Sequence, residues 1–244
     1  MKRFSPDDDD RTLTQTLPRE ERRQRMVDLV MFDIDGTLVD STGFDGPIYA
    51  EAIRSVLGVV VDRDWSTYPH VTDGGLLEEV MTRHGIADSD GSRHAEVKRQ
   101  FVARIEQHVR SDPDSVREIR GAAALLAILR RRPDCRVAIA TGGWRKTALL
   151  KLLAAGFDID GIALATSCDA HPRTAIMQIA AQRATGSVEP RRRTYFGDGD
   201  WDRRACAELG WNFIAIGGGV PHSVAFESFA EHAAILDCLW MQAR

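Results

Sequence analysis

The amino-acid sequence predicts an α/β fold in which a parallel sheet carries helices on both faces and an all-helical segment is inserted after the first strand. From residue 121 to residue 217, short apolar runs typical of buried strands alternate with segments of helical apolar spacing. Between residues 45 and 111, three successive segments have helical spacing and no strong strand pattern interrupts them. We therefore expect a core of residues 26–42 and 116–244 and a helical insert of residues 43–115.

The length and composition of the chain exclude several classes of protein. Its 244 residues are enough to bury a sizeable core. The formal net charge of -4 gives no overall attraction to nucleic acid or to an anionic membrane. No apolar run is long enough to span a bilayer and no secretory signal pattern is visible, so we expect a cytoplasmic protein. Residues 1–25 carry charge without periodicity, which predicts a disordered tail, and Met26 is a candidate translation start.

The elements are expected in the following order. The first strand is VDLVMF, residues 27–32, a continuous apolar run typical of a strand buried on both faces. The insert contains the helical segments PIYAEAIRSVLG, GLLEEVMTRHG and HAEVKRQFVARIEQHV. Four helices and four strands follow, with helices at 121–132, 144–156, 172–184 and 202–210 and strands at 135–141, 161–167, 193–198 and 211–217. We interpret AAILDCL, residues 233–239, as a last short strand or a turn.

Polar side chains follow each of the first four strands. Asp33 and Asp35 come directly after the first strand, and two buried carboxylates so close together repel unless a cation or a proton compensates them. Since ligands in open α/β sheets bind beyond the carboxyl ends of the strands, the residues at the other strand ends should lie near this pair. They are Thr141 with Gly142 and Gly143, Arg173, and Asp198 with Asp202 in GDGDWD.

This set of side chains has the chemistry of a phosphoryl-transfer site. Asp33 and Asp198 come from different strands and offer the oxygen ligands that Mg²⁺ prefers. The Thr141 hydroxyl and the Gly142 amide can donate to phosphoryl oxygens, and Arg173 would add a positive charge. One carboxylate of the first pair can attack phosphorus, and the other can give a proton to the leaving oxygen.

The motifs and their order resemble the haloacid dehalogenase-like superfamily over most of residues 27–237. The first motif of that family, DxDGT, matches Asp33–Thr37, the second matches Thr141 at the end of AIAT, and the fourth matches GDGDWD. The helical insert resembles the cap of the subgroup that includes phosphoglycolate phosphatase and β-phosphoglucomutase. The resemblance implies a Rossmann-like parallel sheet core with an inserted α-helical cap domain.

The resemblance also implies roles for individual residues. Asp33 would be the nucleophile and a Mg²⁺ ligand, and Asp35 would be the general acid/base and would offer its backbone carbonyl to the metal. Asp198 would be a further metal ligand supported by Asp202, and Thr141 would hold the phosphoryl oxygens. The implied cofactor is Mg²⁺ and the implied partner is a small phosphorylated metabolite.

One departure from the family pattern concerns the third motif, which normally supplies a lysine. The matching stretch here is AHPRT, so we expect Arg173 to supply the cation, with Lys146 and Lys151 on the preceding helix as rivals. Arginine keeps the charge but is a planar fork rather than a compact point charge.

The sequence therefore predicts a Mg²⁺-dependent phosphomonoester hydrolase that acts through an aspartyl-phosphate. Asp35 and Asp198 argue against a dehalogenase, and Asp35 also argues against a phosphonate hydrolase of this family. A phosphosugar mutase stays open, as does a non-catalytic binding module, whose support is the arginine at the third motif. The substrate and the oligomeric state are not determined by the sequence. Candidates in the insert for substrate contact are Phe44, Tyr68, His70 and Thr72.

Overall fold

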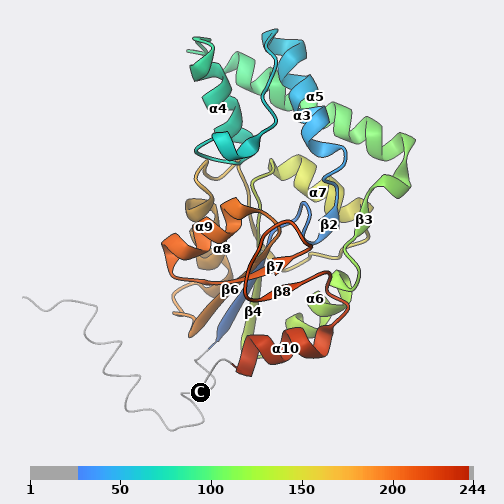
Figure 1. Ribbon diagram of the computed structural model, residues 1–244, viewed down its shortest axis with the longest axis vertical. Coiled ribbons are helices and arrows are strands. Elements are labelled where there is room, and N and C mark those ends of the chain that lie inside the picture. The colour runs from blue at the N-terminus through green and yellow to red at the C-terminus, as the bar shows by residue number, and fades with distance from the viewer. Residues whose placement is uncertain (1–26, 242–244) are drawn as a thin grey trace, which may run out of the picture.

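The computed structural model describes residues 27–241, so the expected tail of residues 1–25 and Met26 lie outside the described residues. A six-stranded parallel sheet with the order β5-β4-β1-β6-β7-β8 forms the centre of the molecule (Figure 1). This confirms the predicted α/β class. The strands are β1 (Asp28–Phe32), β4 (Cys135–Ala140), β5 (Ala163–Ala165), β6 (Arg192–Gly197), β7 (Asn212–Ile216) and β8 (Ala225–Phe226).

Helices cover both faces of the sheet because the strands are apolar on both sides. In β1, Val30 and Phe32 point into a core shared with α6, α7 and α10, while Leu29 and Met31 point into a core shared with α8 and α9. These helices are α6 (Ala122–Arg130), α7 (Arg145–Ala154), α8 (Arg173–Thr185), α9 (Asp200–Leu209) and α10 (His232–Met241).

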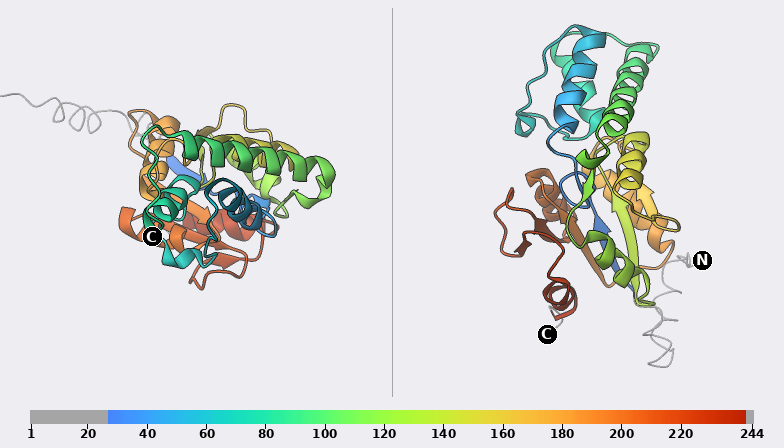
Figure 2. Two further views of the ribbon diagram at one scale, coloured as in Figure 1. Left: turned by 90° about the horizontal axis from the view of Figure 1, so that it is seen from above. Right: turned by 90° about the vertical axis from the view of Figure 1, so that its right-hand side faces the viewer.

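Three further helices form a separate layer over the carboxyl edge of the sheet (Figure 2). They are α3 (Asp45–Leu57), α4 (Asp73–Arg83) and α5 (Ser92–Ser111), and they pack around their own apolar cluster, which includes Ile53 and Phe101. Trp144 of the core is also buried in this cluster, so the helical insert and the core share a packed interface. Across residues 27–241, no helix combines the length and the apolarity needed to cross a membrane.

Two short strands mark the points where the chain leaves the core and returns to it. β2 (Val39–Asp40) and β3 (Arg117–Glu118) pair in antiparallel orientation, with Val39 opposite Glu118. The sequence analysis missed both, and it also missed β8, since two-residue strands have no detectable periodicity. The pairing of β2 with β3 holds the two connections to the helical insert side by side.

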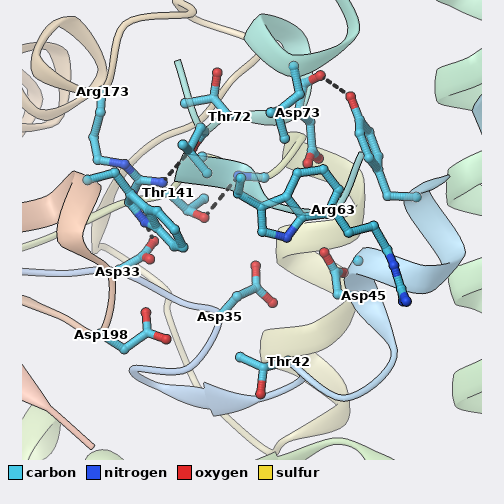
Figure 3. Close-up of a pocket in the computed structure, with 18 of the residues that line it drawn as sticks. Asp33, Asp35, Thr42, Asp45, Arg63, Thr72, Asp73, Thr141, Arg173 and Asp198 are labelled. Atoms are coloured by element: carbon cyan, nitrogen blue, oxygen red, sulfur yellow. Dashed lines mark hydrogen bonds and ion pairs between the residues drawn. The ribbon is translucent and has the colours of Figure 1, made fainter. Parts of the chain in front are cut away.

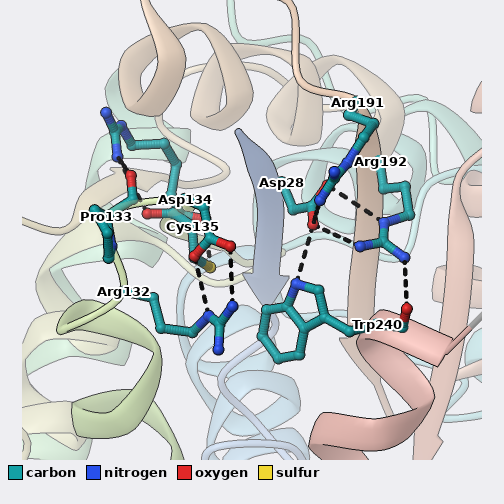
Figure 4. A network of polar contacts seen from close by, with 9 residues as sticks. Asp28, Arg132, Pro133, Asp134, Cys135, Arg191, Arg192 and Trp240 are labelled. Carbon is teal, nitrogen blue, oxygen red and sulfur yellow. Dashed lines mark hydrogen bonds and ion pairs between the residues drawn. The ribbon is translucent and has the colours of Figure 1, made fainter. Parts of the chain in front are cut away.

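The interpretation of residues 233–239 as a strand or a turn was wrong, because they belong to helix α10. Ile235 and Leu239, four residues apart, are both buried in the sheet core, which is helical spacing. The end of the helix is anchored at the amino end of β1, where the Trp240 indole N–H donates to Asp28 at 3.1 Å (Figure 4). Arg132 lies 4.1 Å from the centre of the Trp240 ring. These tertiary contacts decide the helix, and a short apolar run cannot reveal them.

Candidate active site

The side chains that follow three neighbouring strands meet at the carboxyl edge of the sheet. Because β1 pairs with both β4 and β6, the loops after these strands are adjacent. Asp33 follows β1 directly, and its backbone N–H donates to the Phe196 carbonyl oxygen of β6 at 2.9 Å. Thr141 follows β4 and Asp198 follows β6. The strand order therefore brings Asp33 next to two side chains that lie more than 100 residues later in the chain.

Three carboxylates lie close enough to share one cation. Asp33, Asp198 and Asp202 each have an oxygen within 4.8 Å of the other two. Burial raises the pKa of Asp33 to about 7, although the Arg173 charge opposes this shift. Burial also raises the pKa of Asp198 to about 8, and the neighbouring Asp202 and Asp33 add to the increase. The cluster is thus costly to ionise unless a positive charge binds between its members.

The glycine of the DxDGT motif permits this close approach. Gly36 has a φ of +76°, a conformation that favours glycine. A Cβ atom at this position would also collide with the Asp198 carboxylate. The turn after β1 can therefore pass directly beside the acid that follows β6 only because residue 36 lacks a side chain.

Arg173 lies beside two of these acids. Its guanidinium Nη1 is 2.9 Å from Asp202 Oδ1 and 3.6 Å from Asp33 Oδ1. The other terminal nitrogen, Nη2, donates to the Val71 carbonyl oxygen in the helical insert at 3.0 Å. The planar fork of the arginine thus contacts the acids of the core and the backbone of the insert at once.

The two rival lysines lie elsewhere. Lys146 is exposed and pairs with Glu106 of α5 at 2.9 Å. Lys151 is buried and pairs with Asp35 and Asp45 rather than with Asp33. Of the three cations considered for the third motif, Arg173 is the one that the structure brings next to Asp33.

The loop after β4 lies at the same edge of the sheet and lines the same cavity as Asp33 and Asp198. The Thr141 side chain is buried, and its oxygen accepts a hydrogen bond from the Gly143 N–H at 3.1 Å. The Gly142 N–H donates to no group within residues 27–241, while the Gly142 carbonyl oxygen accepts from the Asp73 N–H at 2.8 Å. A hydroxyl and a backbone amide are therefore available to an anion here.

A cavity of about 620 Å³ joins these groups to the helical insert (Figure 3). Its floor contains Asp33, Asp35 and Asp198, and it is of a size typical for a small-molecule site. Of the four insert residues considered for substrate contact, Thr72 lines the cavity and Phe44, Tyr68 and His70 do not. The remaining lining from the insert and its connection comprises Thr42, Gly43, Asp45, Gly46, Pro47, Tyr49, Arg63, Trp65, Val71, Asp73 and Leu76.

Residues 71–75, which comprise the two residues before α4 and the start of the helix, contact the core directly, and we call them the α4 docking segment. The Thr72 hydroxyl donates to the His171 carbonyl oxygen at 2.9 Å, and the Gly74 N–H donates to the Ser167 hydroxyl at 2.8 Å. The Trp144 N–H donates to the Asp73 carboxylate at 2.7 Å. These contacts hold the insert over the cavity.

Two acids of the insert also have raised pKa values. Burial raises the pKa of Asp73 to about 8, and the charge of Asp45 adds to the increase. Burial raises the pKa of Asp45 to about 6, although the Lys151 charge opposes it. The cavity therefore has titratable groups on the insert side as well as at its floor.

Sequence reasoning missed Asp45, Asp73 and the contacts of Lys151. Each lies on a helix with ordinary amphipathic composition, and an acid in a first helical turn is common because it complements the helix dipole. Nothing in the local pattern distinguishes such an acid from one that faces a cavity. The information lies in how the insert sits on the core.

Comparison with solved structures supports the fold assignment. A hydrolase from Pseudomonas syringae has 21% sequence identity and a TM-score of 0.67, with 86% of this chain and 98% of the other covered. CbbY from Rhodobacter sphaeroides, solved in complex with phosphate, has 22% identity and a TM-score of 0.62, with coverage of 84% and 96%. A predicted phosphoglycolate phosphatase from Haemophilus somnus has 18% identity and a TM-score of 0.57, with coverage of 86% and 98%.

The family assignment comes from the sequence of the core and insert together. No curated protein has a significant match to the chain. The family model for haloacid dehalogenase-like hydrolases matches residues 27–210, which contain all the strand-end residues described above. The chain therefore belongs to the haloacid dehalogenase-like hydrolases.

Proposed function

We propose that this protein is a Mg²⁺-dependent phosphomonoester hydrolase that acts on a small soluble phosphate through an aspartyl-phosphate intermediate. The observation that carries the proposal is the position of Asp33 at the floor of the cavity, 3.6 Å from the Arg173 guanidinium and within 4.8 Å of two further carboxylates. A nucleophilic carboxylate, a cation for the phosphoryl charge and a metal-binding cluster are the parts that this reaction needs.

The acids at the cavity floor fit a hard divalent cation. Asp33 Oδ1 and Asp202 Oδ1 are buried and face the charge of Arg173, but neither accepts a hydrogen bond of good geometry from residues 27–241. All the atoms that these acids offer as metal ligands are oxygens, which Mg²⁺ prefers. Asp33, Asp198 and the backbone carbonyl of Asp35 would hold the ion, with Asp202 in support. When bound, the ion would neutralise charge on the phosphoryl group and on the carboxylates.

The residues of the chain then have distinct tasks. Asp33 attacks phosphorus, and the bond from phosphorus to the leaving oxygen breaks as Asp35 gives that oxygen a proton. Water next attacks the aspartyl-phosphate, gives its proton to Asp35 and releases phosphate. The Thr141 hydroxyl and the Gly142 N–H hold phosphoryl oxygens, and Arg173 supplies positive charge.

We further propose that residues 43–115 act as a cap that encloses the leaving group. Tyr49, Trp65 and Leu76 give the cavity an apolar wall on this side, and the α4 docking segment holds the wall against the core. A closed cap excludes water while the phosphorus is attacked. CbbY from Rhodobacter sphaeroides was solved in complex with phosphate, which supports the proposal that this cavity takes a phosphate group.

Hydrolysis of an aryl phosphate with and without Mg²⁺ tests the proposal. Release of phosphate should require Mg²⁺ and should be lost in Asp33→Asn, which keeps the shape of the side chain but removes the nucleophile. Asp200→Asn is the matched control, because Asp200 lies in the same GDGDWD motif but pairs with Arg203 and Arg204 at the surface. The control should keep wild-type turnover.

A folded wild-type protein that releases no phosphate from any ester would contradict the proposal. Full turnover by Asp33→Asn would remove the nucleophile assignment. Interconversion of sugar phosphates without net release of phosphate would instead identify a mutase, and ligand binding without turnover would identify a binding module.

A further inference from the structure

Lys151 is a buried lysine that bridges the core and the insert at the acid/base residue. It lies on α7 with 1% of its side chain exposed, and Nζ is 2.5 Å from Asp35 Oδ1 and 2.8 Å from Asp45 Oδ1. Asp35 belongs to the loop after β1, and Asp45 begins α3 of the insert. The loop after β1, the start of the insert and a helix more than 100 residues later in the chain therefore meet at one ammonium group.

The two carboxylate oxygens of Asp35 have different contacts. Oδ1 accepts from Lys151 Nζ and also from the Ser41 hydroxyl. Oδ2 accepts no hydrogen bond from residues 27–241, and it lies near Gly143, 3.6 Å from where a Cβ atom of that residue would be. Both Asp35 and Gly143 line the cavity. One oxygen is thus anchored and the other is free to face a ligand.

A gain in stability does not explain why a lysine is buried at position 151. The desolvation cost of burying an ammonium and two carboxylates can exceed their mutual attraction, and an apolar replacement of similar size is often neutral. Leu152, the next residue on α7, fills the sheet core without such a cost. A buried ion pair placed on an acid/base residue, rather than elsewhere on the same helix, points to a role in the reaction.

We propose that Lys151 is a positioning residue for Asp35, which anchors Oδ1 together with Ser41 so that Oδ2 faces the leaving group, and that Asp45 ties this arrangement to the docked insert. The inference rests on the phosphatase chemistry proposed above. In the first step, the bond from Asp33 to phosphorus forms while the bond to the leaving oxygen breaks. That oxygen takes the proton from Asp35 Oδ2, so a misplaced Asp35 slows the reaction most where the leaving group needs a proton.

Two esters of nearly equal shape separate this role from a purely structural one. 4-Nitrophenyl phosphate releases a stabilised anion that needs little protonation, whereas phenyl phosphate releases a much more basic oxygen. The ratio kcat/KM reports only the steps up to the first irreversible one, so it excludes hydrolysis of the aspartyl-phosphate. The measurement is kcat/KM for both esters in wild type, Lys151→Met and Asp35→Asn.

We expect Lys151→Met to lose about 100-fold on phenyl phosphate and less than about tenfold on 4-nitrophenyl phosphate, as for partial loss of general acid catalysis. Asp35→Asn should show the same selective loss. Lys146→Met is the matched control on the same helix, because Lys146 is exposed and its pair with Glu106 is a surface one. It should leave both values within about twofold of wild type.

Ser41→Ala provides a second variant with a small change in volume, in case Lys151→Met fails to fold. It removes the other donor to Oδ1 and should also lower the rate more for phenyl phosphate. Equal losses on both esters in Lys151→Met and Ser41→Ala would overturn the proposal.

A crystal structure of the folded variant, Lys151→Met or Ser41→Ala, keeps the inference separate from the proposed function. If wild type hydrolyses neither ester, the function is wrong, and the position of Asp35 still decides the inference. A displaced or disordered carboxylate would support the anchoring role. A carboxylate that stays in place without its anchor would overturn it.

Discussion

The Arg173 guanidinium lies 2.9 Å from the Asp202 carboxylate, which has no exposed surface. The same side chain is 3.6 Å from Asp33 and donates to the Val71 carbonyl oxygen of the insert. An ammonium group is a point charge without the forked geometry of arginine, so it would not reproduce these contacts together.

Replacement of this arginine should therefore show graded effects. We expect Arg173→Lys to lower kcat by about tenfold, because the charge remains but a single ammonium group cannot face the acids and also donate to the Val71 carbonyl oxygen. Arg173→Met should lower it by about 10²–10³, because the phosphoryl charge is then uncompensated and buried acids lose their partner. Steady-state kinetics on an aryl phosphate measures both. Equal activity of the two variants would show that the charge of residue 173 has no part in the reaction.

Loss of one acid from the metal cluster should weaken Mg²⁺ binding. We expect Asp198→Asn to raise the Mg²⁺ concentration needed for half-maximal activity at least about tenfold, since even indirect ligand support has effects of this size. Titration calorimetry should show that wild type releases protons when Mg²⁺ binds at pH 7, because Asp198 has a pKa of about 8 without the ion. Unchanged affinity in Asp198→Asn would remove this residue from the ligand set.

Asp73 should make the stability of the protein depend on pH. Its pKa is raised from the ordinary 3.8 to about 8, so between these values the unfolded chain loses a proton that the folded state keeps. The free energy of unfolding contributed by this residue therefore falls as pH rises through that range and levels off above it. Asp73→Asn removes the titrating group and retains an acceptor for the Trp144 N–H.

Urea denaturation at pH 5, 6, 7 and 8 measures the effect of Asp73. The difference in unfolding free energy between Asp73→Asn and wild type should shift in favour of the variant as pH rises. A difference that is constant across the series would mean that Asp73 is already ionised in the folded protein.

The α4 docking segment requires a residue without a side chain at position 74. A Cβ atom there would lie 2.7 Å from the His171 ring and 2.9 Å from the Ser167 hydroxyl. We expect Gly74→Ala to lower kcat/KM about tenfold by displacing the insert from the core, although alanine is the better helix former. Gly218→Ala, where no heavy atom lies within 4 Å, is the control and should keep wild-type kinetics. The idea fails if both variants behave alike.

Asp28 should affect stability but not activity. It lies at the opposite end of β1 from Asp33, and hydrogen bonds from Arg191 and Arg192 hold its pKa below the usual value although burial opposes this. Asp28→Asn should lower the free energy of unfolding by about 3 kcal/mol, because two charged donors lose their ionised partner. Urea denaturation gives this value, and kcat/KM on an aryl phosphate should not change. A loss of activity in folded Asp28→Asn would contradict the expectation that Asp28, at the far end of β1, has no part in the active site.

Much of the fold and of the candidate site was predictable because it depends on the pattern of apolar and polar residues over short stretches of sequence. Apolar runs such as VDLVMF identify the strands, and parallel pairing brings residues at the strand ends, such as Asp33, Thr141 and Asp198, to one edge. Helix α10 was missed because a short apolar run fits a strand or a helix equally well. Its contacts with Asp28 and the sheet core decide between them.

The identity and order of the strand-end residues could be read from the sequence, since Asp33, Thr141 and Asp198 each follow their strand directly. The packing of the helices on the sheet settled which cation faces which acid: Arg173 lies beside Asp33, and Lys151 lies beside Asp35. It also decided that Asp45 and Asp73 of the insert face the cavity. The charged partners of a side chain depend on how the helices pack across the edge of the sheet. Residues that meet there are separated by long stretches of chain, so the local sequence around each residue does not indicate the contact.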